Sequence, residues 1–137
     1  MILLFVCTGN TCRSPMAEGI ANALAARRGL PLFARSAGIS ALEGCAATEE
    51  AEIAAAEYGA DLSGHRSCRV TAEMCAAADR IAVMTESHRE VLLRAFDIPA
   101  EKICVLNLPD PYGRGQDAYY AAAARIAEAV EELLEGM

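Results

Sequence analysis

A thiol and a guanidinium, Cys7 and Arg13, lie six positions apart near the start of the chain, in the stretch MILLFVCTGNTCRSPMAE. The apolar run at residues 2–6 has the length of a buried parallel strand and is too short to span a membrane. Ser14 and Pro15 are the residue types of a helix N-cap and a first helical position. This succession of strand, tight loop and helix N-terminus predicts an anion cradle, because the loop amides and the first helical amides point at one place.

The chemistry that this loop suits is nucleophilic attack on a phosphoryl group. A loop wrapped around a tetrahedral anion brings its ends together, so Cys7 can lie beneath the anion while Arg13 grips two of its oxygens. The helix dipole and Arg13 favour negative charge and therefore the thiolate, the nucleophilic form of cysteine, and the Ser14 hydroxyl can donate to the same sulfur. The plainer interpretation is a buried structural cysteine beside a surface arginine. We expect the rest of the loop to bind phosphate through Thr8, Gly9, Asn10, Thr11, Cys12 and Ser14.

Two other kinds of phosphate loop are excluded by their patterns. The loop has one glycine and no lysine, so it is not the G-x-x-x-x-G-K-[ST] loop of nucleotide-binding proteins, and G-x-G-x-x-G is also absent.

Attack by a thiolate on phosphorus requires a general acid on the opposite side to protonate the leaving group. Asp110 is the candidate, because it follows the strand expected at residues 102–106 and its loop therefore emerges at the same sheet edge as Cys7. Flanking prolines stiffen that loop. The predicted cycle forms a phosphocysteine at Cys7, after which Asp110 activates water to release phosphate. Arg13 stabilises the equatorial oxygens throughout, and neither a metal nor a cofactor is required.

The loop from Cys7 to Glu18 resembles the active-site loop of the low-molecular-weight protein-tyrosine-phosphatase family. The likeness runs through the whole chain, in RSAG at 35–38, His65-Arg66, Met84-Thr85 and DPYG at 110–113. Within the family the loop is most like the bacterial protein-arginine-phosphatase branch, which has threonine at the position of Thr11, where tyrosine phosphatases usually carry an apolar residue.

This resemblance implies roles for residues outside the loop. Ser36 would hydrogen-bond the phosphate loop, and His65 would bond Asn10 and support the loop's strained backbone. The general acid of the family occupies the position of Asp110, and Tyr112 would line the mouth of the site. Gly113 stands where many tyrosine phosphatases have a second aromatic residue, which favours hydrolysis of phosphoarginine on proteins over phosphotyrosine.

Three alternatives remain open. The closest is a protein-tyrosine phosphatase with the same machinery. Cys68 and Cys75 are spaced like the redox pair of an arsenate reductase of related fold, although that pair follows the third strand and these precede it. A non-catalytic phospho-residue binding module is the last, but binding alone requires neither a nucleophile nor an acid.

A redox role is expected for Cys12. Because Cys7 and Cys12 share one tightly curled loop, their Cα atoms can approach the separation of ~5.5 Å that a disulfide needs. The thiolate is the form of cysteine that peroxide oxidises, and a neighbouring thiol can trap it reversibly.

Composition limits the partners. The chain of 137 residues has a net charge of −7 and a pI near 4.8, which argues against nucleic acid and anionic membranes. Six cysteines without any C-x-x-C, and only two histidines, argue against a zinc site and for reduced core thiols. With no export signal or membrane-spanning run, we expect a soluble cytoplasmic monomer that acts on phosphorylated proteins.

The elements that must position these residues alternate between strands and helices. This alternation predicts one α/β domain over residues 1–137, with three layers, a four-stranded parallel sheet and helices on both faces. The family resemblance agrees with this fold, for which we expect the strand order 2-1-3-4. The phosphate loop would lie at the topological switch point, outside the carboxyl end of the first strand. We expect His88 on the surface and Tyr119 and Tyr120 mainly in packing. The strands are expected at residues 2–6, 32–37, 79–85 and 102–106. The helices are expected at residues 15–28, 48–58, 87–96 and 117–135, with Ser87 and Asp117 capping the last two. A short further helix is expected just after its cap, Thr71.

Overall fold

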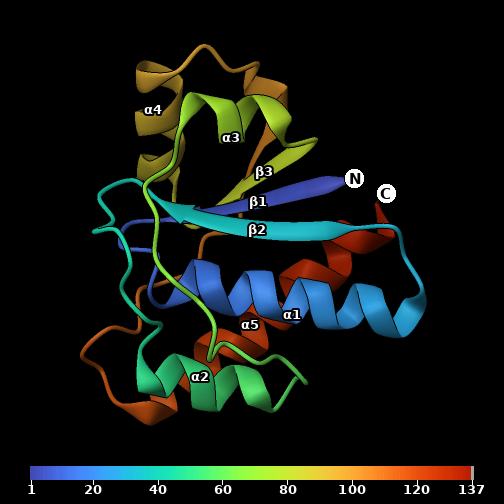
Figure 1. The fold of residues 1–137 in the computed structure, drawn as a ribbon, viewed down its shortest axis with the longest axis vertical. Coiled ribbons are helices and arrows are strands. Elements are labelled where there is room, and N and C mark those ends of the chain that lie inside the picture. The colour runs from blue at the N-terminus through green and yellow to red at the C-terminus, as the bar shows by residue number, and fades with distance from the viewer. Residues whose placement is uncertain (137) are drawn as a thin grey trace.

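The computed structural model describes residues 1–136 as a parallel four-stranded sheet with helices on both faces (Figure 1). The strand order β2-β1-β3-β4 confirms the predicted topology. The strands are β1 (Ile2–Cys7), β2 (Phe33–Gly38), β3 (Arg80–Val83) and β4 (Ile103–Val105). The helices are α1 (Arg13–Arg28), α2 (Glu49–Ala56), α3 (Ala72–Ala77), α4 (Glu86–Ala95) and α5 (Gln116–Glu135), with a 3-10 turn at Ala100–Lys102.

The central strand β1 separates two apolar cores. Its side chains alternate between the faces of the sheet, as the geometry of a strand requires. Leu3 and Phe5 pack with α1, α2 and α5, whereas Leu4 and Val6 pack with α3 and α4. Figure 1 shows these two groups of helices on opposite sides of the sheet. The last residue of β1, Cys7, is thereby placed at the edge from which the phosphate loop begins.

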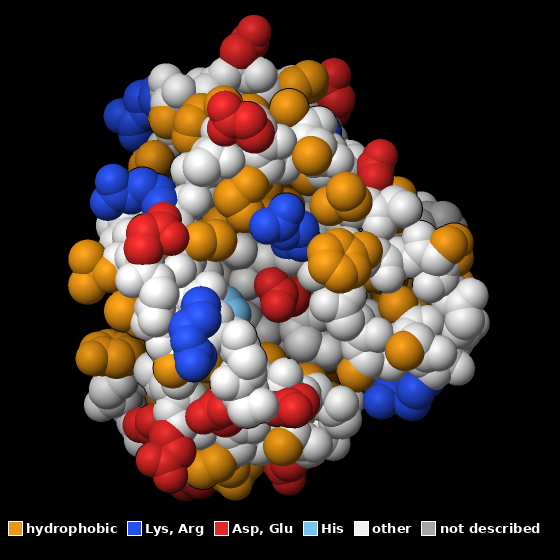
Figure 2. All heavy atoms as spheres, viewed as in Figure 1, with side chains coloured by type: hydrophobic (Ala, Val, Ile, Leu, Met, Phe, Trp, Pro, Cys, Tyr) orange, Lys and Arg blue, Asp and Glu red, His pale blue; other side chains and the backbone are white. Residues whose placement is uncertain are grey.

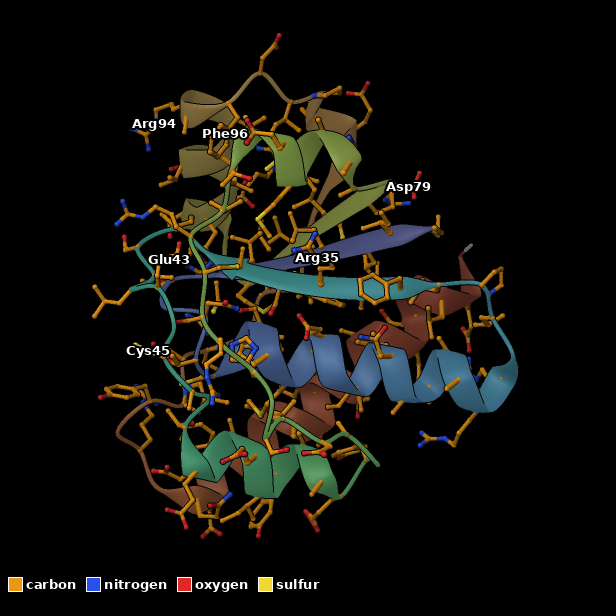
Figure 3. The ribbon with its side chains drawn as sticks, viewed as in Figure 1. Arg35, Glu43, Cys45, Asp79, Arg94 and Phe96 are labelled. Carbon is orange, nitrogen blue, oxygen red and sulfur yellow. The ribbon has the colours of Figure 1, made fainter. Side chains whose placement is uncertain are left out.

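Two side chains bind backbone groups of the sheet, one at the start of β1 and one along the edge strand β2. At the start of β1 the Ile2 amide donates to Asp79 Oδ2 at 2.7 Å, which ties β1 to the residue before β3 (Figure 3). On the outer edge of β2, Asn22 of α1 receives a hydrogen bond from the Ala34 amide at 2.8 Å and donates to the Ala34 carbonyl at 3.0 Å. This pair satisfies backbone groups that an edge strand would otherwise present to another chain.

Three helices start at positions other than the predicted ones. In α1 the N-cap position is Cys12, and the buried hydroxyl of Ser14 instead contacts Cys7 and Asn10 in the loop before the helix. In α4 the cap is Thr85, whose Oγ1 accepts the His88 amide at 3.3 Å, and Ser87 is already inside the helix. In α5 Gly115 precedes the first residue, Gln116, so Asp117 lies in the first turn.

The caps predicted for the two short helices are correct. Thr48 Oγ1 accepts the Ala51 amide at 3.2 Å in α2, and Thr71 Oγ1 accepts the Met74 amide at 3.1 Å in α3. Acidic side chains gather over α2, at the bottom of the view in Figure 2, where three glutamates occupy the first turn and complement the helix dipole. Within residues 1–136 no helix has the length and apolarity needed to cross a membrane.

Candidate active site

The loop that follows β1 encloses a cavity of about 290 Å³ at the carboxyl end of the sheet. From β1 the chain continues through α1 to β2 on one side, while β3 lies on the other, so the loop occupies the topological switch point. The segment after β4 closes the cavity from across the sheet edge. The lining residues are Cys7, Thr8, Gly9, Thr11, Cys12, Arg13, Asp110 and Tyr112.

The sulfur of Cys7 lies at the base of this cavity and has two hydrogen-bond partners. Ser14 Oγ is 2.9 Å away, and the Asn10 amide donates to the sulfur at 3.3 Å. Since Asn10 Nδ2 donates to Ser14 Oγ at 2.8 Å, the serine hydrogen is available for Cys7 Sγ. These two contacts hold the Cys7 sulfur in place at the base of the cavity.

Asn10 holds the loop in shape. Its φ of 57° is in the left-handed region, which is uncommon for a residue other than glycine and costs energy. Asn10 Nδ2 also donates to Ser36 Oγ at 3.0 Å, and His65 Nε2 donates to the Asn10 carbonyl at 2.7 Å. Sequence reasoning missed a further contact, in which the Cys68 amide donates to Asn10 Oδ1 at 3.0 Å. Ser36 and His65 therefore lie where their proposed supporting roles require them.

Arg13 and Asp110 meet across the cavity from different elements. Arg13 is only 4% exposed, and its Nη1 donates to the Leu108 carbonyl at 2.9 Å. Its Nη2 lies 3.8 Å from Asp110 Oδ2, while the side chain of Asp110 is 54% exposed. A buried guanidinium strongly favours an anion in the cavity that it faces, because burial weakens its solvation by water.

The wall and mouth of the cavity are formed by Thr11 and Tyr112. Thr11 is half-buried, and its carbonyl accepts the Thr48 amide at 3.0 Å, which fixes it to the cap of α2. Tyr112 is 68% exposed, and its amide donates to Asp110 Oδ1 at 3.1 Å. Gly113 follows with a φ of 75°, a conformation that suits glycine.

Cys12 is buried between the cavity and α5. Its sulfur lies 3.2 Å from the hydroxyl of Tyr119, so this tyrosine does more than the packing predicted for it. Burial raises the pKa of the Cys12 thiol above its ordinary value, although the Tyr119 hydroxyl opposes that change. Burial, followed by the Cys12 contact, also raises the pKa of Tyr119. The pair is therefore a neutral thiol and a neutral phenol near pH 7.

The prediction that His88 is a surface residue is wrong. Its side chain is buried under the loop because α4 begins at Glu86 and turns its first residues towards Thr8. His88 Nε2 lies 2.8 Å from Thr8 Oγ1. The available signal was the spacing of His88 and Leu92, which are four positions apart and therefore share the buried face of α4. Across residues 1–136 no three His, Cys, Asp or Glu side chains form a cluster able to hold a metal ion.

Comparison with known proteins agrees with this geometry. A model of the low molecular weight phosphotyrosine protein phosphatase family matches residues 2–137. The chain is 34% identical to a protein-arginine-phosphatase of Bacillus subtilis, over 97% of this chain and 94% of that protein. A low molecular weight protein tyrosine phosphatase from T. tengcongensis superposes with a TM-score of 0.96 at 38% identity, covering 100% and 99% of the two chains. The arginine phosphatase YwlE, as a mutant with a phosphorylated active-site serine, superposes with a TM-score of 0.93 at 33% identity, covering 99% and 95%. This chain belongs to the low molecular weight protein phosphatase family.

Proposed function

We propose that this protein phosphatase hydrolyses phosphoarginine on proteins through a phosphocysteine at Cys7. The observation that carries the choice of substrate is Thr11, a hydroxyl-bearing side chain on the wall of a cavity that also contains Cys7 and Arg13. The similarity to a protein-arginine-phosphatase supports this choice, and the similarity to tyrosine phosphatases makes phosphotyrosine the second candidate.

In the first step Cys7 Sγ attacks phosphorus in line, and the bond from phosphorus to the guanidine nitrogen breaks. Asp110 gives its proton to that nitrogen, which also receives the electron pair of the broken bond, so arginine leaves with a protonated guanidinium. In the second step Asp110 takes a proton from water, the water oxygen attacks phosphorus, and the sulfur leaves as a thiolate. Phosphate is released and Asp110 is again protonated.

The loop and Arg13 stabilise the charge that moves through both steps. Arg13 is anchored by Leu108, so its guanidinium is already oriented towards the cavity before a substrate binds. Donors fixed in this way act without reorganisation and stabilise the equatorial oxygens of the transition state. The phosphorylated active-site serine of the YwlE mutant supports a covalent route, because in that relative the active-site position carries a phosphoryl group.

Selection of phosphoarginine would rest on polar groups near the leaving group. Thr11 Oγ1 can accept an N–H of the substrate guanidinium, and its branched β-carbon narrows the space that an aromatic ring would occupy. Once Asp110 has given up its proton, its exposed carboxylate can pair with the same guanidinium as it leaves. Gly113 adds no second aromatic side chain beside Tyr112, so an aryl ring at the mouth of the cavity would pack against only one aromatic residue.

The other two alternatives receive less support. Neither Cys68 nor Cys75 lines the cavity, and Cys75, a residue of α3, is buried in the core, which does not suit the redox pair of an arsenate reductase. A binding module would not need a carboxylate 3.8 Å from Arg13 at the mouth of the cavity.

The experiment is a comparison of kcat/KM on matched phosphoarginine and phosphotyrosine peptides for the wild type and Thr11→Ile. We expect the wild type to prefer phosphoarginine, and Thr11→Ile to lower that preference by about 10–200-fold, the range of a single pocket contact. Retained hydrolysis of an aryl phosphate by Thr11→Ile shows that the Cys7 chemistry is intact. A wild type that prefers phosphotyrosine, or an unchanged ratio in the variant, contradicts the arginine assignment.

A further inference from the structure

His88 and Thr8 are joined by a hydrogen bond that the proposed mechanism does not use. Thr8 directly follows Cys7 and lines the catalytic cavity, whereas His88 belongs to α4, 80 positions away. Their side chains meet with Thr8 Oγ1 2.8 Å from His88 Nε2. Thr8 is exposed to the cavity and His88 is 7% exposed, so the contact links the cavity wall to the interior of the protein.

Both ends of this hydrogen bond are held in place by other contacts. The His88 amide donates to Thr85 Oγ1 at 3.3 Å at the start of α4, and Leu92 of the same helix is fully buried against the sheet. The Thr8 carbonyl accepts the Ser40 amide at 2.9 Å. Because neither residue is free to move away, the contact can set the direction of the Thr8 hydroxyl.

The protonation state of His88 limits which group donates. Burial, and after it the charge of Arg13, lowers the pKa of His88 to about 4, while Asp110 acts in the opposite direction. The ring is therefore neutral near pH 7 and carries one N–H. Nδ1 is buried and has no hydrogen-bond partner in the described part of the chain. Proteins tolerate a buried acceptor without a partner better than a buried N–H without one, so the hydrogen belongs on Nε2.

We propose that His88 donates from Nε2 to Thr8 Oγ1 and thereby turns the Thr8 hydroxyl into the cavity as a donor to the bound phosphoryl group. A hydroxyl that accepts one hydrogen bond still has its own hydrogen to give. In the opposite tautomer Thr8 would donate to the ring and would present lone pairs to the anion. His88 is thus a positioning residue that does not touch the substrate, and Thr8 is the residue that contacts it. This inference rests on the proposed function only in that the cavity binds a phosphoryl group.

The test measures inhibition by inorganic phosphate during hydrolysis of an aryl phosphate, using Thr8→Val, His88→Ala and the double variant. Thr8→Val keeps the shape of the side chain and removes the hydroxyl, so we expect the inhibition constant to rise about tenfold, as for a lost hydrogen bond to a charged group. His88→Ala should give most of the same loss, and the double variant should be no worse than Thr8→Val, since both act on one contact. His88→Gln, whose amide N–H can take the place of Nε2–H, should recover most of the binding.

The matched control is Thr71→Val, which removes a capping hydroxyl in α3, outside the cavity. It should lower thermal stability and leave the phosphate inhibition constant at the wild-type value. If His88→Ala lowers stability but not phosphate affinity, or if the losses in the double variant add, His88 has only a structural role and the inference is wrong.

A second readout uses the wild type alone, so it does not depend on any variant folding. Nitrogen-15 NMR of the His88 ring should show the Nε2–H tautomer, and an Nδ1–H ring would overturn the inference. Neither readout depends on which phosphorylated residue is the substrate, so a preference for phosphotyrosine would contradict the proposed specificity without affecting this result. A wild type that binds no phosphate in the cavity would contradict both.

Discussion

A Cβ atom on Gly38 would lie 2.7 Å from the carbonyl oxygen of Thr8, closer than two such atoms can approach. The same atom would lie 3.0 Å from the Asn10 amide nitrogen. The end of β2 therefore supports the phosphate loop by direct contact between backbones, which only glycine permits. The amide of Gly38 in turn donates to the Cys68 carbonyl at 2.9 Å, so the residue cannot simply move aside.

Replacing Gly38 should therefore damage catalysis more than stability. In Gly38→Ala the added methyl pushes on Thr8 and Asn10, and displacements of about 1 Å in an active site can cost as much as 10²-fold. We expect kcat/KM on an aryl phosphate to fall by about 10–100-fold. Gly64→Ala is the matched control, because a Cβ there meets no atom within 4 Å. Equal activity of the two variants would show that the loop does not depend on this contact.

Asp110 should matter most for poor leaving groups. Asp110→Asn keeps the shape of the side chain but cannot donate a proton, so turnover of a phosphoarginine peptide should fall by about 10²–10⁴-fold. An aryl phosphate with a very acidic phenol needs little protonation and should lose much less. Asp117→Asn, an exposed acid in the first turn of α5, is the control. The same loss on both substrates would contradict the role of general acid.

The buried His88 predicts a loss of stability in weak acid. Its pKa is about 4 in the folded protein and near the ordinary value of 6.5 in the unfolded chain, so between these values the unfolded state binds more protons. The free energy of unfolding should therefore fall as pH drops from about 6.5 towards 4, by on the order of 2–3 kcal/mol from this residue. Urea unfolding at several pH values should show a flatter dependence for His88→Gln, and parallel curves would mean that His88 is not held neutral.

Peroxide treatment tests the proposed redox role of Cys12. Oxidation of Cys7 to the sulfenic acid, followed by attack of Cys12 and loss of water, would give a disulfide that dithiothreitol reduces. Because burial raises the pKa of Cys12, ring closure should be faster at higher pH, where more of its thiol is ionised. The wild type and Cys45→Ser, which lacks an exposed thiol, should recover activity, whereas Cys12→Ser should recover far less. Equal recovery in all three would exclude a protective disulfide.

The local pattern of the sequence was sufficient for the elements and for the phosphate loop, and the family resemblance agreed with it on the fold. Apolar runs, caps and the order of elements predicted the sheet, because each signal lies within a few residues. Cys7, Arg13 and Ser14 could be placed together for the same reason, since a strand, a loop and a helix follow one another directly. The position of Asp110 followed from the rule that parallel strands end at one sheet edge.

Contacts between distant segments could not be predicted in this way. The hydrogen bond from His88 to Thr8 depends on how the start of α4 lies against the loop after β1, which is 80 positions earlier in the chain. The contact of Tyr119 with Cys12 depends on how α5 rotates against α1, which its apolar pattern does not specify to one residue. The two hydrogen bonds between the Asn22 side chain of α1 and the Ala34 backbone of β2 similarly depend on the register between a helix and an edge strand.

The central claim is that Cys7 accepts the phosphoryl group of phosphoarginine. The most direct measurement mixes the wild type with a peptide labelled with phosphorus-32 on arginine, stops the reaction with acid within one turnover, and locates the label on the protein. We expect label on Cys7, formed faster than from a matched phosphotyrosine peptide, and none on Cys7→Ala. Phosphate release from the arginine peptide without a labelled protein, or faster labelling from phosphotyrosine, would contradict the account.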